Sequence, residues 1–115
     1  MNQIVLGMSL PFAICAALYL KQRGMLGWRI LIGAPLAMLA GGAWAIVPDF
    51  PRLWGDLVWY TDLHHHPHCW IWFNHCHIDR NETDSPLWIA LFLAMTCSAL
   101  AAVWREIARS ERHTL

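Results

Sequence analysis

The stretch that decides the fold is residues 30–47, ILIGAPLAMLAGGAWAIV, in which no side chain is ionisable. Residues 4–20 and 87–104 are similarly apolar, and their only ionisable groups are cysteine thiols and the phenol of Tyr19. As a helix rising 1.5 Å per residue, each run covers roughly 26 Å, close to the thickness of a bilayer's hydrocarbon core. A helix of this length in a soluble protein would keep a polar face, and these runs have no continuous one. The sequence therefore predicts an all-α integral membrane protein with three transmembrane helices.

The composition agrees with one membrane domain spanning residues 1–115. Of the 115 residues, 57% are hydrophobic and only 14% are charged, whereas soluble domains carry about 25% charged residues. The first apolar run could instead be a cleaved signal peptide, but nothing before Lys21 is positively charged. A signal peptide needs a basic leading region, so we expect residues 4–20 to stay as a permanent span.

The charges outside the spans predict an orientation. The link between the first two spans and the tail after the third are basic, whereas residues 48–86 carry six acids against two arginines. Positive loops stay in the cytoplasm, so we expect the N-terminus and the cap, residues 48–86, to lie outside and the C-terminus to be cytoplasmic. A bacterial inner membrane is the expected location. Acidic side chains are costly at the bilayer centre, and six of them exclude a fourth span.

Small residues recur every fourth position in all three spans. Such stripes allow membrane helices to approach closely, so they predict a compact three-helix bundle, with homo-oligomerisation or partner membrane subunits as further possibilities. The stripes consist of Ser9, Ala13 and Ala17; of Gly33, Ala37, Gly41 and Ala45; and of Ala90, Ala94, Ser98 and Ala102. The serine and proline at 85–86 are typical of a helix start and predict where the third span begins.

The cap begins with a helical pattern. Pro51 suits a first helical turn, and Leu53, Leu57 and Val58 follow at helical spacing. This predicts one helix over about residues 51–63, with Trp54 on its apolar face. An amphipathic helix lying in the membrane interface is the expected role.

The most distinctive part of the cap is residues 64–79, HHHPHCWIWFNHCHID, which holds six of the seven histidines. As a helix, His68, His75 and Asp79 would share a face. As a strand, His75 and His77 would point the same way. The pattern leaves both interpretations open.

Cys69 and Cys76 can distinguish these backbones. Outside the cytoplasm cysteines tend to form disulfides. A helix would hold their Cα atoms about 10 Å apart, which is too far for a disulfide. A disulfide here would therefore require a bent backbone, while Cys15 and Cys97 lie within spans and are expected to be small core residues.

Clustered imidazoles and carboxylates are the ligands that divalent metals such as zinc use in proteins. The sequence therefore predicts a divalent-metal site, with zinc as the expected ion, on the outer face. The candidate ligands are Asp49, His65, His68, His75, His77 and Asp79, with Asp84 in reserve. Structural histidines, or histidines that serve proton or haem chemistry, are the alternatives. No CxxCH haem motif occurs, and the zero net charge with an acidic cap argues against nucleic acid.

The strings AIVPDFPRL (45–53) and HIDRNETDSP (77–86), separated by the histidine cluster, resemble segments of small bacterial inner-membrane proteins described as metal-dependent hydrolases. The resemblance covers less than half of the chain. It implies that Pro48-Asp49 and one or two cap histidines take part in a hydrolytic metal site. A non-enzymatic accessory subunit of a larger membrane complex is the alternative function.

Overall fold

The computed structural model describes residues 2–22, 27–80 and 85–114, without the side chains of residues 79, 80, 113 and 114. The described residues contain helices and turns and no strand. Three helices are long and apolar enough to cross a membrane: α1 (Asn2–Gln22), α2 (Gly27–Ala45) and α6 (Pro86–Thr114). The prediction of an all-α chain with three apolar, membrane-length helices is therefore confirmed, and each lies over the segment expected for it.

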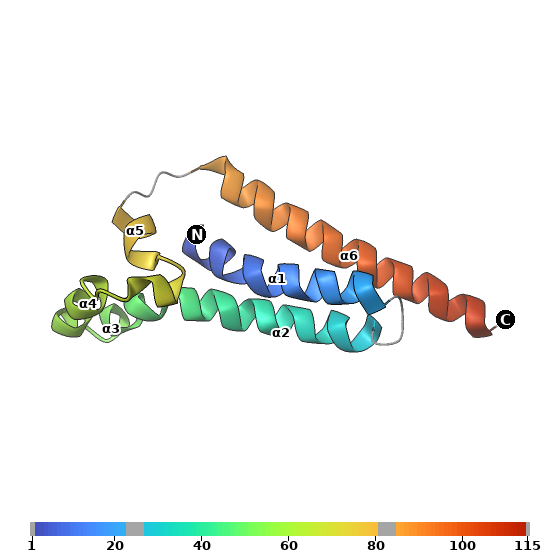
Figure 1. The fold of residues 1–115 in the computed structure, drawn as a ribbon, viewed down its shortest axis with the longest axis horizontal. Helices are drawn as coiled ribbons and strands as arrows, with labels where there is room; N and C mark the ends of the chain where they lie inside the picture. Colours follow the sequence, from blue (N-terminus) through green and yellow to red (C-terminus); the bar gives the residue numbers. More distant parts are fainter. Residues whose placement is uncertain (1, 23–26, 81–84, 115) are drawn as a thin grey trace.

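The helices form an elongated bundle (Figure 1). α1 and α2 make an antiparallel hairpin, and α6 packs more loosely along it. Large apolar side chains face outward along all three helices, as expected for contact with lipid. Examples that are at least half exposed are Leu10, Ile32, Leu36, Leu39, Leu93 and Leu100. A single chain is described, so the predicted oligomers or partner subunits stay predictions.

Glycine permits the close approach of α1 and α2. A Cβ atom at Gly7 would lie 2.7 Å from the Cβ of Ala45, and one at Gly41 would lie 2.8 Å from Cγ of Pro11. Gly41 and Ala45, two residues of the predicted α2 stripe, thus contact α1. The small residue that they meet there is Gly7, which is not part of the predicted α1 stripe. Two residues of the predicted α1 stripe, Ser9 and Ala13, instead line one hollow together with residues of α6.

The end of the bundle opposite the cap contains a polar contact between two helices. The hydroxyl of Tyr19 donates to Oε1 of the buried Glu106 at 2.6 Å, and Nη1 of Arg109 lies 3.5 Å from the same oxygen. This contact joins α1 to α6. The last residues of α1, the start of α2 and the C-terminal end of α6 lie at this end, while the start of α1 and the short cap helices lie at the other (Figure 1). The basic segments therefore share one end, although the direction in which the chain crosses a membrane stays a prediction.

The described part of the cap, residues 48–80, contains five short helices, and its backbone differs from the predicted one. They are η1 (Val47–Asp49), α3 (Phe50–Leu53), α4 (Leu57–His64), η2 (Cys69–Trp72) and α5 (His75–Arg80). The single helix predicted over residues 51–63 is wrong, because the chain turns at Gly55 with a φ of +84°. Asp56 then caps α4 by accepting from the backbone N–H of Trp59 at 3.0 Å.

Residues 68–79 form neither a continuous helix nor a strand. η2 and α5 are separated by Phe73 and Asn74, which both have positive φ. This bend brings Cys69 and Cys76 together in a disulfide with a Cα–Cα distance of 6.1 Å. The chain thus adopts the bent backbone that a disulfide at this spacing requires.

Candidate metal site

Three side chains from different cap elements meet at the end of α2. They are Asp49 at the end of η1, His64 at the end of α4 and His75 at the start of α5. The two Nε2 atoms lie 3.2 Å apart, and Oδ1 of Asp49 lies 3.3 Å from that of His75 and 3.5 Å from that of His64. These three residues can hold a metal ion.

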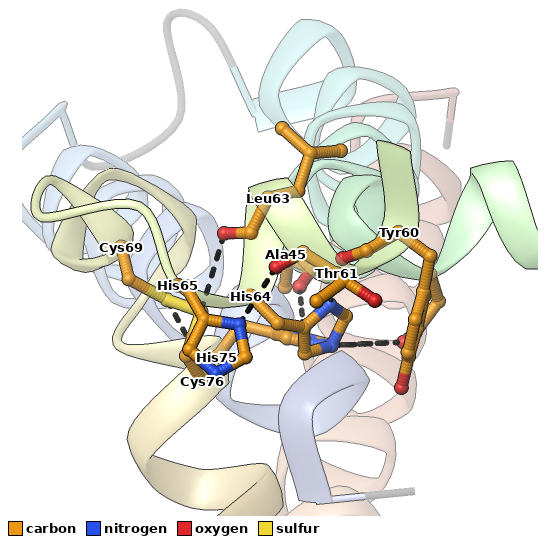
Figure 2. A network of polar contacts seen from close by, with 10 residues as sticks. Ala45, Tyr60, Thr61, Leu63, His64, His65, Cys69, His75 and Cys76 are labelled. Atoms are coloured by element: carbon orange, nitrogen blue, oxygen red, sulfur yellow. Dashed lines mark hydrogen bonds and ion pairs between the residues drawn. A yellow bond between two sulfur atoms is a disulfide. The ribbon is translucent and has the colours of Figure 1, made fainter. Parts of the chain in front are cut away.

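His75 is fixed by the end of α2. Its side chain is completely buried, and its Nδ1 lies 2.8 Å from the carbonyl oxygen of Ala45 (Figure 2). The last carbonyls of a helix lack partners within that helix, so His75 supplies one from outside. A carbonyl can only accept, so Nδ1 carries the proton. In the neutral ring Nε2 then bears the lone pair that faces the other two residues.

His64 is held in the same way by its own helix. Its Nδ1 lies 2.9 Å from the carbonyl oxygen of Tyr60, one turn earlier in α4. The ring of Tyr60 packs against that of His64 with centroids 4.0 Å apart, and only 12% of the His64 side chain is exposed. Its Nδ1 must also donate, so its Nε2 is an acceptor in the neutral ring. Metal-bound histidines usually have such an outer partner, which orients the ring.

Asp49 is the third residue of the group and the one most accessible to solvent. Its side chain is 37% exposed, in contrast to the buried His75. Burial raises the pKa of Asp49, but a hydrogen bond from protonated His75, the positive charges that His75 and His64 carry when protonated, and the charge of Arg52 outweigh it, so the pKa lies below its ordinary value of 3.8. Asp49 is therefore a carboxylate at neutral pH.

When both histidines are neutral, as metal binding requires, three electron-pair donors lie within 3.5 Å of one another. Such an arrangement is stabilised by a cation between the donors, which can be a shared proton or a metal ion. The triangle has nearly equal sides and belongs to three elements that are distant in sequence. A single ion near the centre of this triangle can therefore contact all three atoms.

The site contains two of the six predicted ligands. Asp49 and His75 belong to the group, whereas His65, His68 and His77 lie outside it and are exposed. Nδ1 of His65 contacts the carbonyl oxygen of Thr61 at 2.9 Å. The backbone N–H of His68 donates to Nδ1 of His66 at 3.2 Å. The side chains of Asp79 and Asp84 lie outside the described residues.

His64 was not among the predicted ligands, although the sequence contained a usable signal. Asp56 is a good N-cap, and a helix that starts there runs to His64, two turns later. Three histidines are consecutive at 64–66, and the sequence does not show which of them is the ligand unless the start of the helix is known. In the structure the helix that follows Asp56 ends at His64.

The Cys69–Cys76 disulfide lies next to both histidines of the site. Cys76 follows His75, and its Sγ lies 3.8 Å from the carbonyl oxygen of Leu63, the residue before His64 (Figure 2). The cap is also joined to α2, because Nε1 of Trp44 donates to the carbonyl oxygen of Ile71 at 3.0 Å. The site is thus supported by covalent and hydrogen-bonded contacts outside the three residues themselves.

Comparisons with protein-family models, with curated proteins and with solved structures found no match to this chain. The resemblance to metal-dependent hydrolases therefore stays a prediction.

Proposed function

We propose that this chain is a small integral membrane protein that binds one zinc ion through Asp49, His64 and His75 at the outer end of its helices. The observation that carries the proposal is the convergence of the three donor atoms while both Nδ1 atoms are engaged by backbone carbonyls. A buried, pre-oriented imidazole pair beside a carboxylate is expensive to assemble unless a cation stabilises it.

The size of the triangle supports zinc. Ligand atoms at about 2.0–2.1 Å from a tetrahedral ion lie about 3.3–3.4 Å from one another. The three distances here are 3.2, 3.3 and 3.5 Å. Two imidazole nitrogens and one carboxylate oxygen form a ligand set that zinc accepts, and three protein ligands leave a fourth position open.

An open position favours a hydrolytic role over a purely structural one. Zinc with three protein ligands lowers the pKa of a bound water to about 7 and polarises ester and phosphoryl oxygens. Asp49 is the most exposed of the three residues, so solvent and substrate would enter on its side. This chemistry is also what the resemblance to metal-dependent hydrolases implies.

The disulfide supports an outer location for the cap, because disulfides persist in oxidising compartments. The basic residues at the opposite end support the same orientation. We therefore place the site on the periplasmic side of a bacterial inner membrane.

Metal analysis of detergent-purified protein tests the proposal. After purification in zinc-supplemented medium without an affinity resin that uses metal, we expect about one zinc per chain. His64→Gln and His75→Gln should each lose it, whereas the matched controls His65→Gln and His77→Gln should retain it. Equal zinc content in all five proteins, or none in any, would exclude the site.

A further inference from the structure

A membrane crossed by α2 would place the proposed site at the depth of the lipid headgroups. α2 has 19 residues, which corresponds to about 28 Å of helix and nearly matches a hydrocarbon core of about 30 Å. Ala45 is its last residue, and His75 bonds directly to the carbonyl of Ala45. The three donor atoms are therefore found where the apolar helix ends and the polar layer of the membrane begins.

The residues around the site suit that layer. Trp44, one residue before the end of α2, is 49% exposed and uses its indole N–H to hold the cap. Leu53, Trp54, Leu57 and Val58 are all more than 60% exposed on the neighbouring α3–α4 segment. Tryptophan and exposed apolar groups beside polar ones are typical of the membrane interface. Figure 1 shows this segment continuing from the end of α2.

Arg52 adds a positive charge next to the three donors. Its guanidinium carbon lies 5.9 Å from the centroid of the Tyr60 ring, and that ring packs on His64. Arg52 is also close enough to Asp49 to favour its charged form. The guanidinium is exposed, and an arginine in this position is suited to bind two oxygens of a phosphate.

We propose that the ligand of the open metal position is the phosphomonoester headgroup of a membrane lipid, with one phosphate oxygen on the metal and others paired with Arg52. The inference rests on the proposed zinc site. A divalent ion, the carboxylate of Asp49 and the guanidinium of Arg52 together carry two positive charges. A phosphomonoester carries nearly two negative charges at neutral pH, so it matches the site better than a phosphodiester or a neutral ester does.

Cobalt can replace zinc as a visible probe, because its absorption spectrum changes when a fourth ligand is exchanged. We would load the full-length protein with Co²⁺ in phosphatidylcholine nanodiscs and titrate three additions separately. These are phosphatidic acid in the disc, more phosphatidylcholine, and inorganic phosphate in the water. The variants are Arg52→Gln and, as a matched control at the opposite end, Arg105→Gln, which is also exposed.

The expected result is a spectral change at low mole fractions of phosphatidic acid and none with phosphatidylcholine. Arg52→Gln should require about tenfold more phosphatidic acid, in line with the loss of one charge-assisted contact, while Arg105→Gln should behave as the wild type. Inorganic phosphate should act only at much higher concentration, because it is not confined to the membrane.

Each part of the inference can fail separately. If cobalt binds but phosphatidic acid leaves its spectrum unchanged, the lipid ligand is wrong and the metal site stands. If inorganic phosphate acts as strongly as the lipid, the source is a soluble anion and the lipid assignment is overturned. If both arginine variants respond alike, Arg52 does not contact the phosphate. If no cobalt binds, the proposed function itself fails.

Discussion

At the scale of single residues, the site depends on which nitrogen of each histidine faces inward. Ala45 and Tyr60 fix this choice through their backbone carbonyls. The sequence does not show which backbone carbonyl will accept a hydrogen bond from a given histidine. For this reason it indicated Asp49 and His75 as candidate ligands but not His64. Spacing identifies residues that share a face of one element, whereas these three residues meet only after the cap has folded.

Asp49→Asn should weaken zinc binding strongly. Loss of an outer hydrogen-bond partner of a metal ligand typically costs 10–100-fold in affinity, so loss of the charged ligand itself should cost more than about 100-fold. A competition titration with a fluorescent zinc chelator measures this. Asp62→Asn is the matched control, since Asp62 is exposed on α4 and is not among the three converging residues. An equal loss in both variants would mean that general charge, rather than ligation, holds the ion.

Zinc release on acidification should follow the histidines and not Asp49. The pKa of Asp49 is depressed below 3.8 in the folded protein. Its stabilising charge is therefore fully present above that value and is lost only when the pH falls through the still lower folded-state pKa. Histidine must be neutral to bind metal and ordinarily titrates near about 6.5. Bound zinc, measured after desalting at stepwise lower pH, should leave well before the carboxylate range. Retention of the zinc down to about pH 4 would contradict the two-histidine site.

At the scale of elements, the three long helices were predictable because an apolar run of sufficient length is a local property of the chain. The breaks in the cap were less visible. Gly55 can adopt a positive φ at little conformational cost, but a glycine within a helical pattern does not by itself predict a turn. Phe73 and Asn74 adopt positive φ without being glycine, and the disulfide closes the bend that they make.

Removing the disulfide should loosen the site without unfolding the bundle. A cross-link over this short loop stabilises the folded cap by about 2–3 kcal/mol, and it lies beside both histidines. We expect Cys69→Ser with Cys76→Ser to lower zinc affinity while the helical circular dichroism and melting of the protein in detergent change little. The control is Cys15→Ser with Cys97→Ser, which removes the two free thiols. An unchanged zinc affinity in the cap variant would show that the disulfide does not support the site.

The contact between α1 and α2 can be tested with glycines of one helix. A Cβ at Gly41 would meet the backbone of α1, whereas one at Gly33 would meet nothing within 4 Å. Gly41→Val should therefore separate the helices and lower the thermal stability of the protein in detergent by several degrees. Gly33→Val introduces the same side chain into the same helix and should be tolerated. If both variants melt alike, the hairpin does not depend on close backbone contact.

At the scale of the whole molecule, one end of the bundle carries the short cap helices and the start of α1, and the other carries the last residues of α1, the start of α2 and the C-terminal end of α6 (Figure 1). The sequence predicts this division because three spans place the link between the first two spans and the C-terminal tail on one side and the cap on the other, and charge then distinguishes those sides. The distance between the ends also separates two kinds of polar cluster. Asp49, His64 and His75 converge beside solvent, whereas Glu106 is buried against Tyr19.

The orientation can be tested with single cysteines in a Cys15→Ser, Cys97→Ser background. Asp62 in the cap and Glu111 near the C-terminus are exposed in the structure, so Asp62→Cys and Glu111→Cys should leave the fold intact. A membrane-impermeant maleimide applied to intact bacterial spheroplasts should label Asp62→Cys at once and Glu111→Cys only after the membrane is opened. The reverse pattern would place Asp49, His64 and His75 in the cytoplasm, where the disulfide would be reduced. Because both the metal site and its lipid ligand are proposed for the outer leaflet, this single measurement tests the location of both.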